Sequence, residues 1–192
     1  MSFVLLYATD SGAILKGDRR MSNSNKDITF EGFLKVIQIN KNLAVGCTGG
    51  VEFMLKNLYD TYMKNKEVGI TEFSRLFRES IVNNVRNSNI KHKGGSYLMA
   101  GIEDGFLRIN VVLCNEKVYE DSLVERPIGS KPILLASGTC GGDNPTEFAN
   151  KVFSEAEGTL DERLNTIIYK AADVSPYVNK KIDTVSIGVL NE

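Results

Sequence analysis

The order in which strand-like and helix-like segments follow one another is the feature that most constrains the fold of this chain. Short apolar runs separated by turn residues fill positions 3–47, and two amphipathic helical segments follow at about 51–63 and 71–87. Strand-like runs then cover 97–114, a stretch near 117–119 and 133–137; two helices begin near 145 and 160, and 184–190 forms a closing strand. Because runs of strands alternate with pairs of helices, simple βαβ winding is not expected.

Capping signals indicate where the helices begin. Thr71 can cap the second helical segment, and Asn144, followed by Pro145 and Glu147, marks the start of the third. Positions 159–162 read Thr-Leu-Asp-Glu, which is a capping box. Two stacked, mainly antiparallel sheets with a helical pair on each outer face would bury every apolar stripe, so the sequence predicts an α+β, four-layer αββα sandwich. The 192 residues contain no evident linker, and positions 1–192 are expected to form a single domain.

The charge balance and the cysteines exclude several classes of function. The 23 basic and 24 acidic residues give a net charge of −1, so neither a nucleic acid nor a membrane is expected as a partner. Cys47, Cys114 and Cys140 show no CxxC spacing, which argues against a disulfide framework and a zinc site and favours a reducing cytoplasm. No apolar run approaches the roughly 20 residues that a transmembrane helix needs. The sequence predicts no cofactor.

Candidate functional residues lie at the ends of the predicted strands. Ser2 directly precedes the first strand, Asp18 ends the second, and Lys35 begins the third. Gly49 lies between a strand and a helix, and Ser137 ends a later strand.

Taken together, these motifs resemble those of the proteasome β-type subunits and of the ring peptidase of bacterial ATP-dependent proteases, which are N-terminal-nucleophile hydrolases of the threonine peptidase family. The matching residues, in chain order, are Ser2, Asp18 with Arg20, Lys35, Thr48-Gly49-Gly50 and Ala136-Ser137-Gly138. The resemblance spans almost the whole chain. It implies the αββα fold, hydrolysis of peptide or unfolded-protein substrates through an acyl-enzyme, and a ring-forming homo-oligomer with an ATPase as a candidate partner.

The resemblance also implies roles for individual residues, and each role has a chemical reason. Ser2 would be the nucleophile, and its own free α-amine, which titrates near about pH 7.7–8.0, would be the general base. Lys35 would lower the pKa of that amine, and Asp18 would supply the carboxylate that a buried lysine needs. The Gly49 N–H would face the oxyanion, and Ser137 completes the catalytic set. The substrate-binding positions implied in the same way are Met21, Ser22 and Cys47.

The sequence departs from the family pattern at three points. The nucleophile is Ser2 where the family has Thr, which keeps the hydroxyl but loses the methyl group that restricts its rotamer. The Asp that family members often carry after the fourth helix is absent, because Ser175 or Pro176 falls there and Asp173 lies slightly upstream. Finally, Ser2 has a free α-amine only if Met1 is removed, which small second residues usually permit.

Three functions therefore stay open at the level of the sequence. The first is an N-terminal-nucleophile peptidase that works in a ring. The second is a catalytically silent structural or binding member of the same fold, as the α-type proteasome subunits are. Those subunits carry an additional N-terminal helix, whereas a strand begins here at residue 3, which favours the β type. The third is a small-molecule amidase of the wider class. Taken as a single residue, Cys47 is favoured as part of the core rather than of a binding pocket.

Overall fold

The computed structural model describes residues 2–22, 27–62, 67–87, 89–90, 93–115 and 119–190. Met1, on whose removal the proposed nucleophile depends, lies outside these ranges. The strand predicted near 117–119 also lies largely outside them, and the described strand at this point, β9, runs from Tyr119 to Glu125.

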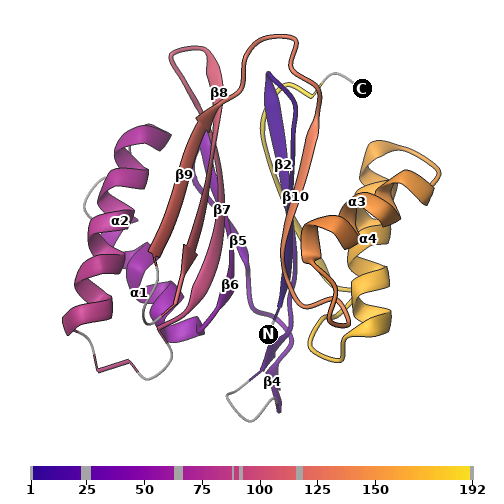
Figure 1. The fold of residues 1–192 in the computed structure, drawn as a ribbon, viewed down its shortest axis with the longest axis horizontal. Coiled ribbons are helices and arrows are strands. Elements are labelled where there is room, and N and C mark those ends of the chain that lie inside the picture. Colours follow the sequence, from indigo (N-terminus) through magenta and orange to yellow (C-terminus); the bar gives the residue numbers. More distant parts are fainter. Residues whose placement is uncertain are drawn as a thin grey trace.

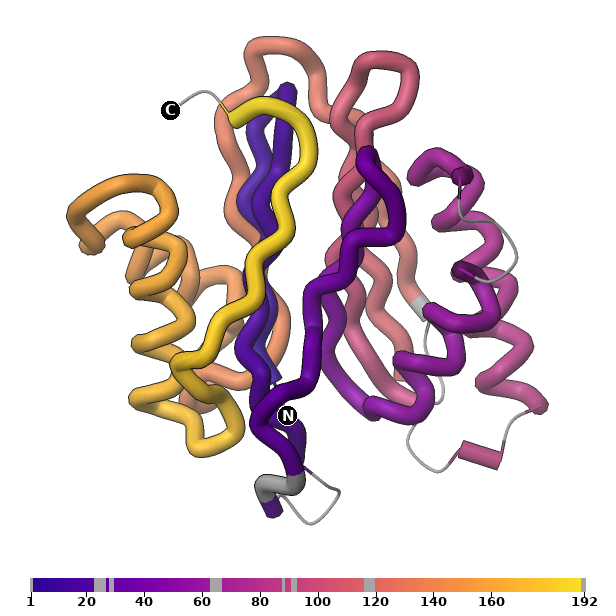
Figure 2. The backbone as a smooth tube through the Cα atoms, turned by 180° about the vertical axis from the view of Figure 1, so that it is seen from behind, coloured from indigo at the N-terminus to yellow at the C-terminus, as the bar shows by residue number. Residues whose placement is uncertain are grey.

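One sheet is formed by both ends of the chain together with a strand from its second half. Its strand order is β10-β1-β2-β11, and every neighbouring pair is antiparallel. The strands are β1 (Phe3–Ala8), β2 (Gly12–Asp18), β10 (Ile133–Gly138) and β11 (Ile182–Gly188). Figure 2 shows β11, in yellow, beside the hairpin of β1 and β2. Residues from the start and the end of the sequence therefore meet in this sheet.

The second sheet is an antiparallel meander in the order β5-β6-β7-β8-β9. Its strands are β5 (Val36–Asn40), β6 (Leu43–Gly49), β7 (Gly95–Glu103), β8 (Phe106–Cys114) and β9. A short separate pair, β3 (Met21–Ser22) with β4 (Ile28–Phe30), lies between β2 and β5 in the chain. β10 is an edge strand of the four-stranded sheet, and β9 is an edge strand of the five-stranded sheet.

The helices cover the outer faces of the two sheets in pairs (Figure 1). The first pair is α1 (Val51–Tyr62) and α2 (Ile70–Asn87), beside the five-stranded sheet, and the second is α3 (Pro145–Glu155) and α4 (Leu160–Val174), beside the four-stranded sheet. The predicted αββα sandwich is therefore confirmed. Among the described helices, none is long and apolar enough to cross a bilayer.

The side chains of β1 alternate between two hydrophobic cores, one on each face of the sheet. Val4 and Leu6 belong to the core between the two sheets, whereas Phe3 and Leu5 pack in the core beneath α3 and α4. Successive side chains of a strand point to opposite faces, so a strand in the middle of a four-layer fold is apolar on both. A third core lies between the other sheet and α1 and α2, with Phe73 and Phe77 stacked in it.

The capping predictions have mixed outcomes. The Asn144 side chain accepts hydrogen bonds from the N–H groups of Thr146 and Glu147, and Thr159 with Glu162 forms the predicted capping box. Thr71 is not the cap of α2, because that helix begins at Ile70. The Thr71 hydroxyl instead donates to the Glu103 carboxylate, which lies at the end of the neighbouring strand β7.

Candidate active site

Ser2 is buried at one end of the sandwich, immediately before β1, and its backbone is held from two sides. The N–H of the next residue, Phe3, donates to Asp18 Oδ1 at 2.8 Å, and the Ser2 carbonyl accepts from Thr139 N–H at 3.0 Å. Gly138 has a φ of 128°, and a Cβ there would lie 1.9 Å from the Ser2 oxygen. Only glycine allows this close approach, so the backbone at Ser2 is tightly placed.

Asp18 and Lys35 form a buried ion pair directly behind this backbone. Asp18 is the last residue of β2 and Lys35 immediately precedes β5, and Lys35 Nζ lies 2.6 Å from Asp18 Oδ1. The two side chains are 0% and 4% exposed, which is rare for charges unless they are paired. The predicted ion pair is therefore confirmed.

Backbone groups complete the surroundings of the ion pair. Asp18 Oδ2 accepts from the N–H of Arg20 at 2.8 Å and of Asn179 at 3.3 Å. Lys35 Nζ also donates to the Arg20 carbonyl at 2.5 Å. Because an ammonium has three donors, Lys35 keeps one N–H without an acceptor among the described residues. Burial lowers the pKa of Lys35 and the Asp18 carboxylate opposes that effect, which leaves a lysine that is easier to deprotonate than usual.

A small pocket brings Ser2 and Lys35 together with the predicted substrate-binding residues. Met21, Ser22 and Cys47 all line it, and its volume is about 10 Å³. Cys47 is fully buried, its Sγ lies 3.3 Å from the Lys35 carbonyl oxygen, and burial raises the pKa of its thiol to about 12. Cys47 is therefore a packed, protonated side chain that closes the floor of this pocket, which we call the Cys47 pocket.

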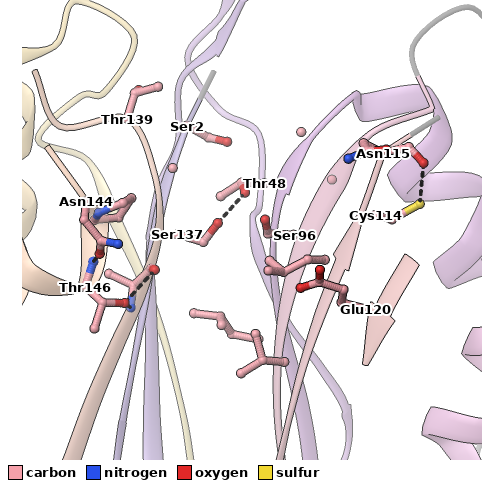
Figure 3. Close-up of a pocket in the computed structure, with 18 residues that line it drawn as sticks. Ser2, Thr48, Ser96, Cys114, Asn115, Glu120, Ser137, Thr139, Asn144 and Thr146 are labelled. Carbon is pink, nitrogen blue, oxygen red and sulfur yellow. Dashed lines mark hydrogen bonds between the residues drawn. The ribbon is translucent and has the colours of Figure 1, made fainter. Parts of the chain in front are cut away.

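Ser137 and Gly49 line one cavity between the two sheets, and Ser137 contacts Thr48, the residue before Gly49. Ser137 Oγ lies 2.9 Å from Thr48 Oγ1, so a hydroxyl pair links β10 to β6 (Figure 3). Gly49 has a φ of 123°, and a Cβ there would lie 2.4 Å from the Gly94 carbonyl oxygen. Gly49 and Ser2 both line the Cys47 pocket and a second, larger cavity. The structure thus gathers all five residues predicted as catalytic at one end of the sandwich.

The larger cavity was not predicted from the sequence. It lies between the two sheets beside β10, has a volume of about 660 Å³, and is called the intersheet cleft below (Figure 3). Its lining includes Ser96, Leu98, Val111, Leu113 and Glu120 in addition to the residues near Ser2. Their alternation along strands β7, β8 and β9 is the signal that could have placed them on one face.

The residues at the end of α4 and directly after it do not supply the missing carboxylate. Ser175 caps α4, is buried, and has its Oγ 3.2 Å from Thr139 Oγ1. Asp173 is exposed and forms an ion pair with Lys180 at 2.7 Å, so it points away from the site. Asn179, which the sequence gave no reason to select, contacts Asp18 through its N–H instead. Within the described ranges, no group of three or more His, Cys, Asp or Glu side chains could hold a metal ion.

Comparison with known proteins shows which solved structures share this fold. No protein-family model matches the chain, and no curated protein matches its sequence. Among solved structures, eukaryotic HslV from Trypanosoma brucei matches with a TM-score of 0.62 at 14% identity over 97% of this chain and 99% of the other. Anbu (ancestral beta-subunit) from Yersinia bercovieri matches with a TM-score of 0.69 at 14% identity, over 97% of this chain and 81% of the other. The predicted resemblance to proteasome β-type subunits is therefore confirmed at the level of the fold.

Proposed function

We propose that this chain is an N-terminal-nucleophile hydrolase that cleaves peptide bonds through an acyl-enzyme on Ser2. The observation that carries the proposal is the buried Asp18–Lys35 ion pair. Asp18 accepts from the Phe3 N–H, and Lys35 lines the same pocket as Ser2. A buried ion pair is weak evidence for stability, because desolvation offsets most of its attraction. Its position behind a buried serine supports a role in the chemistry of that serine.

The first step requires removal of Met1, which converts the amide nitrogen of Ser2 into an α-amine. That amine takes the proton from Ser2 Oγ as the oxygen attacks the substrate carbonyl. The Lys35 ammonium lowers the pKa of the amine and so keeps it unprotonated near neutral pH. Asp18 holds Lys35 in place, and the unused N–H of Lys35 is available to the reacting groups.

The second step breaks the peptide bond. The Gly49 N–H stabilises the developing oxyanion, a contribution typically worth about 10²–10³-fold in rate. The α-ammonium returns its proton to the departing amine, the C–N bond breaks, and an ester on Ser2 remains. Water then attacks the ester with the same amine as base, which releases the acid and restores Ser2. Ser137, whose Oγ lies 2.9 Å from Thr48 Oγ1, lines the same cavity as Ser2.

The fold and the balanced surface charge also support an assembly. We propose a closed ring of identical subunits in the cytoplasm that acts on peptides or unfolded protein segments, with an ATPase as a candidate partner. Heterologous contacts around one axis would close such a ring.

The decisive experiment measures hydrolysis of a panel of fluorogenic peptides by protein whose loss of Met1 is verified by intact mass. Ser2→Ala should abolish turnover, and Lys35→Ala should nearly do so. Lys16 offers a matched control, since it is another buried lysine, held by Asp161, Asn165 and Thr184 on the α4 side of the sheet. Folded Lys16→Met protein should keep its activity. Turnover that survives in Ser2→Ala would place the nucleophile elsewhere.

One observation favours a second candidate function, a catalytically silent member of the same fold. Ser175 stands where the family often carries an Asp, and Asp173 is paired with Lys180 away from the site. A verified free Ser2 amine with no turnover on any peptide would select this alternative. The variant Ser175→Asp would then be the direct test, because restored hydrolysis would identify the missing carboxylate as the cause.

A further inference from the structure

We infer that the intersheet cleft selects among the larger side chains of a substrate, and that it takes a basic side chain on the leaving-group side of the scissile bond. The inference rests on the proposed function, since it assumes that Ser2 is the nucleophile.

The two cavities beside Ser2 differ greatly in the side chain that they can hold. The Cys47 pocket has a volume of about 10 Å³, and the intersheet cleft about 660 Å³. A cavity needs roughly 10–15 Å³ of this kind of volume to hold a single water molecule. The Cys47 pocket therefore accepts little more than a methyl group, so on the acyl side it can select only for a small residue. Selection among larger side chains must come from the cleft.

The exposed rim of the cleft identifies the side of the substrate that it receives. After the acyl-enzyme forms, the amine product has to leave and water has to enter before the ester is hydrolysed. The Cys47 pocket offers no room for either movement. The cleft has exposed residues at its rim, among them Asn115, Glu120 and Asn144, and it reaches Ser2 and Gly49. The leaving-group half of the substrate therefore lies in the cleft, and the acyl half faces the Cys47 pocket.

The floor of the cleft is apolar and only partly covered. Leu98 of β7 and Val111 and Leu113 of β8 line it. Val111 is half-buried and Leu113 is 43% exposed, because β8 lies near the free edge of its sheet. An aliphatic stem that covers these groups gains roughly fourfold in affinity for each methylene that it buries.

Glu120 supplies the charge. In the β8–β9 register Leu113 lies opposite Glu120, so both side chains stand on the same face of the sheet, and Figure 3 shows the Glu120 carboxylate directed toward the cleft. Of the described residues that line the cleft, Glu120 alone is charged, and it has no ion-pair partner among them. An apolar floor below a single carboxylate matches the aliphatic stem and cationic end of Lys or Arg.

The test uses internally quenched peptides with alanine before the intended bond and Lys, Gly or Glu after it, with the cleaved bond identified by mass spectrometry. We expect kcat/KM for Lys to exceed that for Glu by roughly five- to tenfold, the range for an accessible ion pair and its like-charge counterpart. Glu120→Lys should invert that preference. Asp121→Lys is the matched control, because it changes the net charge equally, while Asp121 pairs with Val112 and so faces the opposite side of the sheet.

A binding measurement separates the cleft from the chemistry. The chain contains no tryptophan, so Leu113→Trp places a single fluorophore at the cleft, and Leu123→Trp places one on the opposite face of the same sheet. Both are combined with Ser2→Ala and titrated with the dipeptide amide Lys-Leu-NH₂. Only the Leu113→Trp protein should show a saturable change in emission, and Glu-Leu-NH₂ should bind more weakly by a similar factor.

The outcomes distinguish the two proposals. Turnover that depends on Ser2 but ignores the residue after the bond, and is unchanged by Glu120→Lys, overturns the inference and leaves the proposed function intact. Absence of turnover with a free Ser2 amine overturns the proposed function. In that case a saturable Leu113→Trp response to Lys-Leu-NH₂ supports the cleft as a site for basic peptides, and a flat titration overturns that as well.

Discussion

Replacing Asp18 by alanine tests the central interaction of the site. The carboxylate accepts four hydrogen bonds, from Lys35 Nζ at 2.6 Å and from the N–H groups of Phe3, Arg20 and Asn179 at 2.8, 2.8 and 3.3 Å. Asp18→Ala leaves the Lys35 ammonium with the Arg20 carbonyl as its acceptor among the described residues. Removing one partner of a buried ion pair costs about 3–5 kcal/mol, a large part of the about 5–15 kcal/mol that stabilises a typical fold.

Asp161→Ala provides the matched comparison. Asp161 also pairs with a buried lysine, Lys16, at 2.6 Å, but the Asp161 side chain is 62% exposed. Lys16 keeps two other acceptors after the substitution, Asn165 Oδ1 at 2.7 Å and Thr184 Oγ1 at 3.1 Å. We therefore expect Asp161→Ala to cost only about 1 kcal/mol.

The assay is urea unfolding at pH 7, followed by far-ultraviolet circular dichroism at one fixed protein concentration, because subunit association would shift the midpoint. The double variant Asp18→Ala/Lys35→Met removes both charges and should recover about 2 kcal/mol or more relative to Asp18→Ala alone. The reasoning is refuted if Asp18→Ala costs no more than Asp161→Ala at an unchanged m-value, or if the double variant recovers nothing.

Further predictions concern the backbone at Ser2, the response to acid, and assembly. Gly138→Ala should lower the free energy of unfolding in urea by more than about 3 kcal/mol, because its Cβ would lie 1.9 Å from the Ser2 oxygen. Gly142 also has a positive φ, 103°, but a Cβ there would meet no atom within 4 Å, so Gly142→Ala should lower it by only about 1 kcal/mol. The hydrogen bond from Lys16 holds the pKa of Asp161 below its ordinary 3.8. The Asp161–Lys16 interaction therefore stabilises the fold fully above pH 3.8, and this stabilisation is lost as the pH falls through the lower pKa of Asp161 in the folded protein. Asp161→Asn should flatten this part of a plot of Tm against pH. An unchanged slope would contradict the prediction. Light scattering should detect a closed ring of roughly six or more subunits, and a monomer at micromolar concentration would argue against the ring.

Local rules account for much of what the sequence predicted correctly. Asn144 and Thr159 cap their helices as expected, because a cap depends on residues within one turn of it. Thr71 fails as a cap because α2 begins one residue earlier, at Ile70, and the Glu103 carboxylate from a distant strand accepts from both the N–H and the hydroxyl of Thr71. The pairing of Asp18 with Lys35 was implied by the resemblance to proteasome β-type subunits, and its chemical reason is that a buried lysine requires a carboxylate.

The Cys47 pocket shows where such reasoning stops. The resemblance implied Met21, Ser22 and Cys47 as substrate-binding residues, and the structure does bring them together with Ser2. Nothing in the sequence indicated that the volume left among them would be only about 10 Å³. Volume depends on how side chains from several elements pack, and small displacements of those elements change it.

By itself, the sequence determined the period of each apolar run, and with it which segments are strands or helices and which faces they bury, because these properties follow from neighbouring residues along the chain. The tertiary structure decided how far apart the buried faces lie and which distant groups meet. It brought the Asn179 N–H to Asp18 Oδ2, although 161 positions separate them, and it left the intersheet cleft open while the Cys47 pocket closed. The physical reason is that periodicity specifies the direction of a side chain, whereas partners and cavities depend on the separation of packed layers.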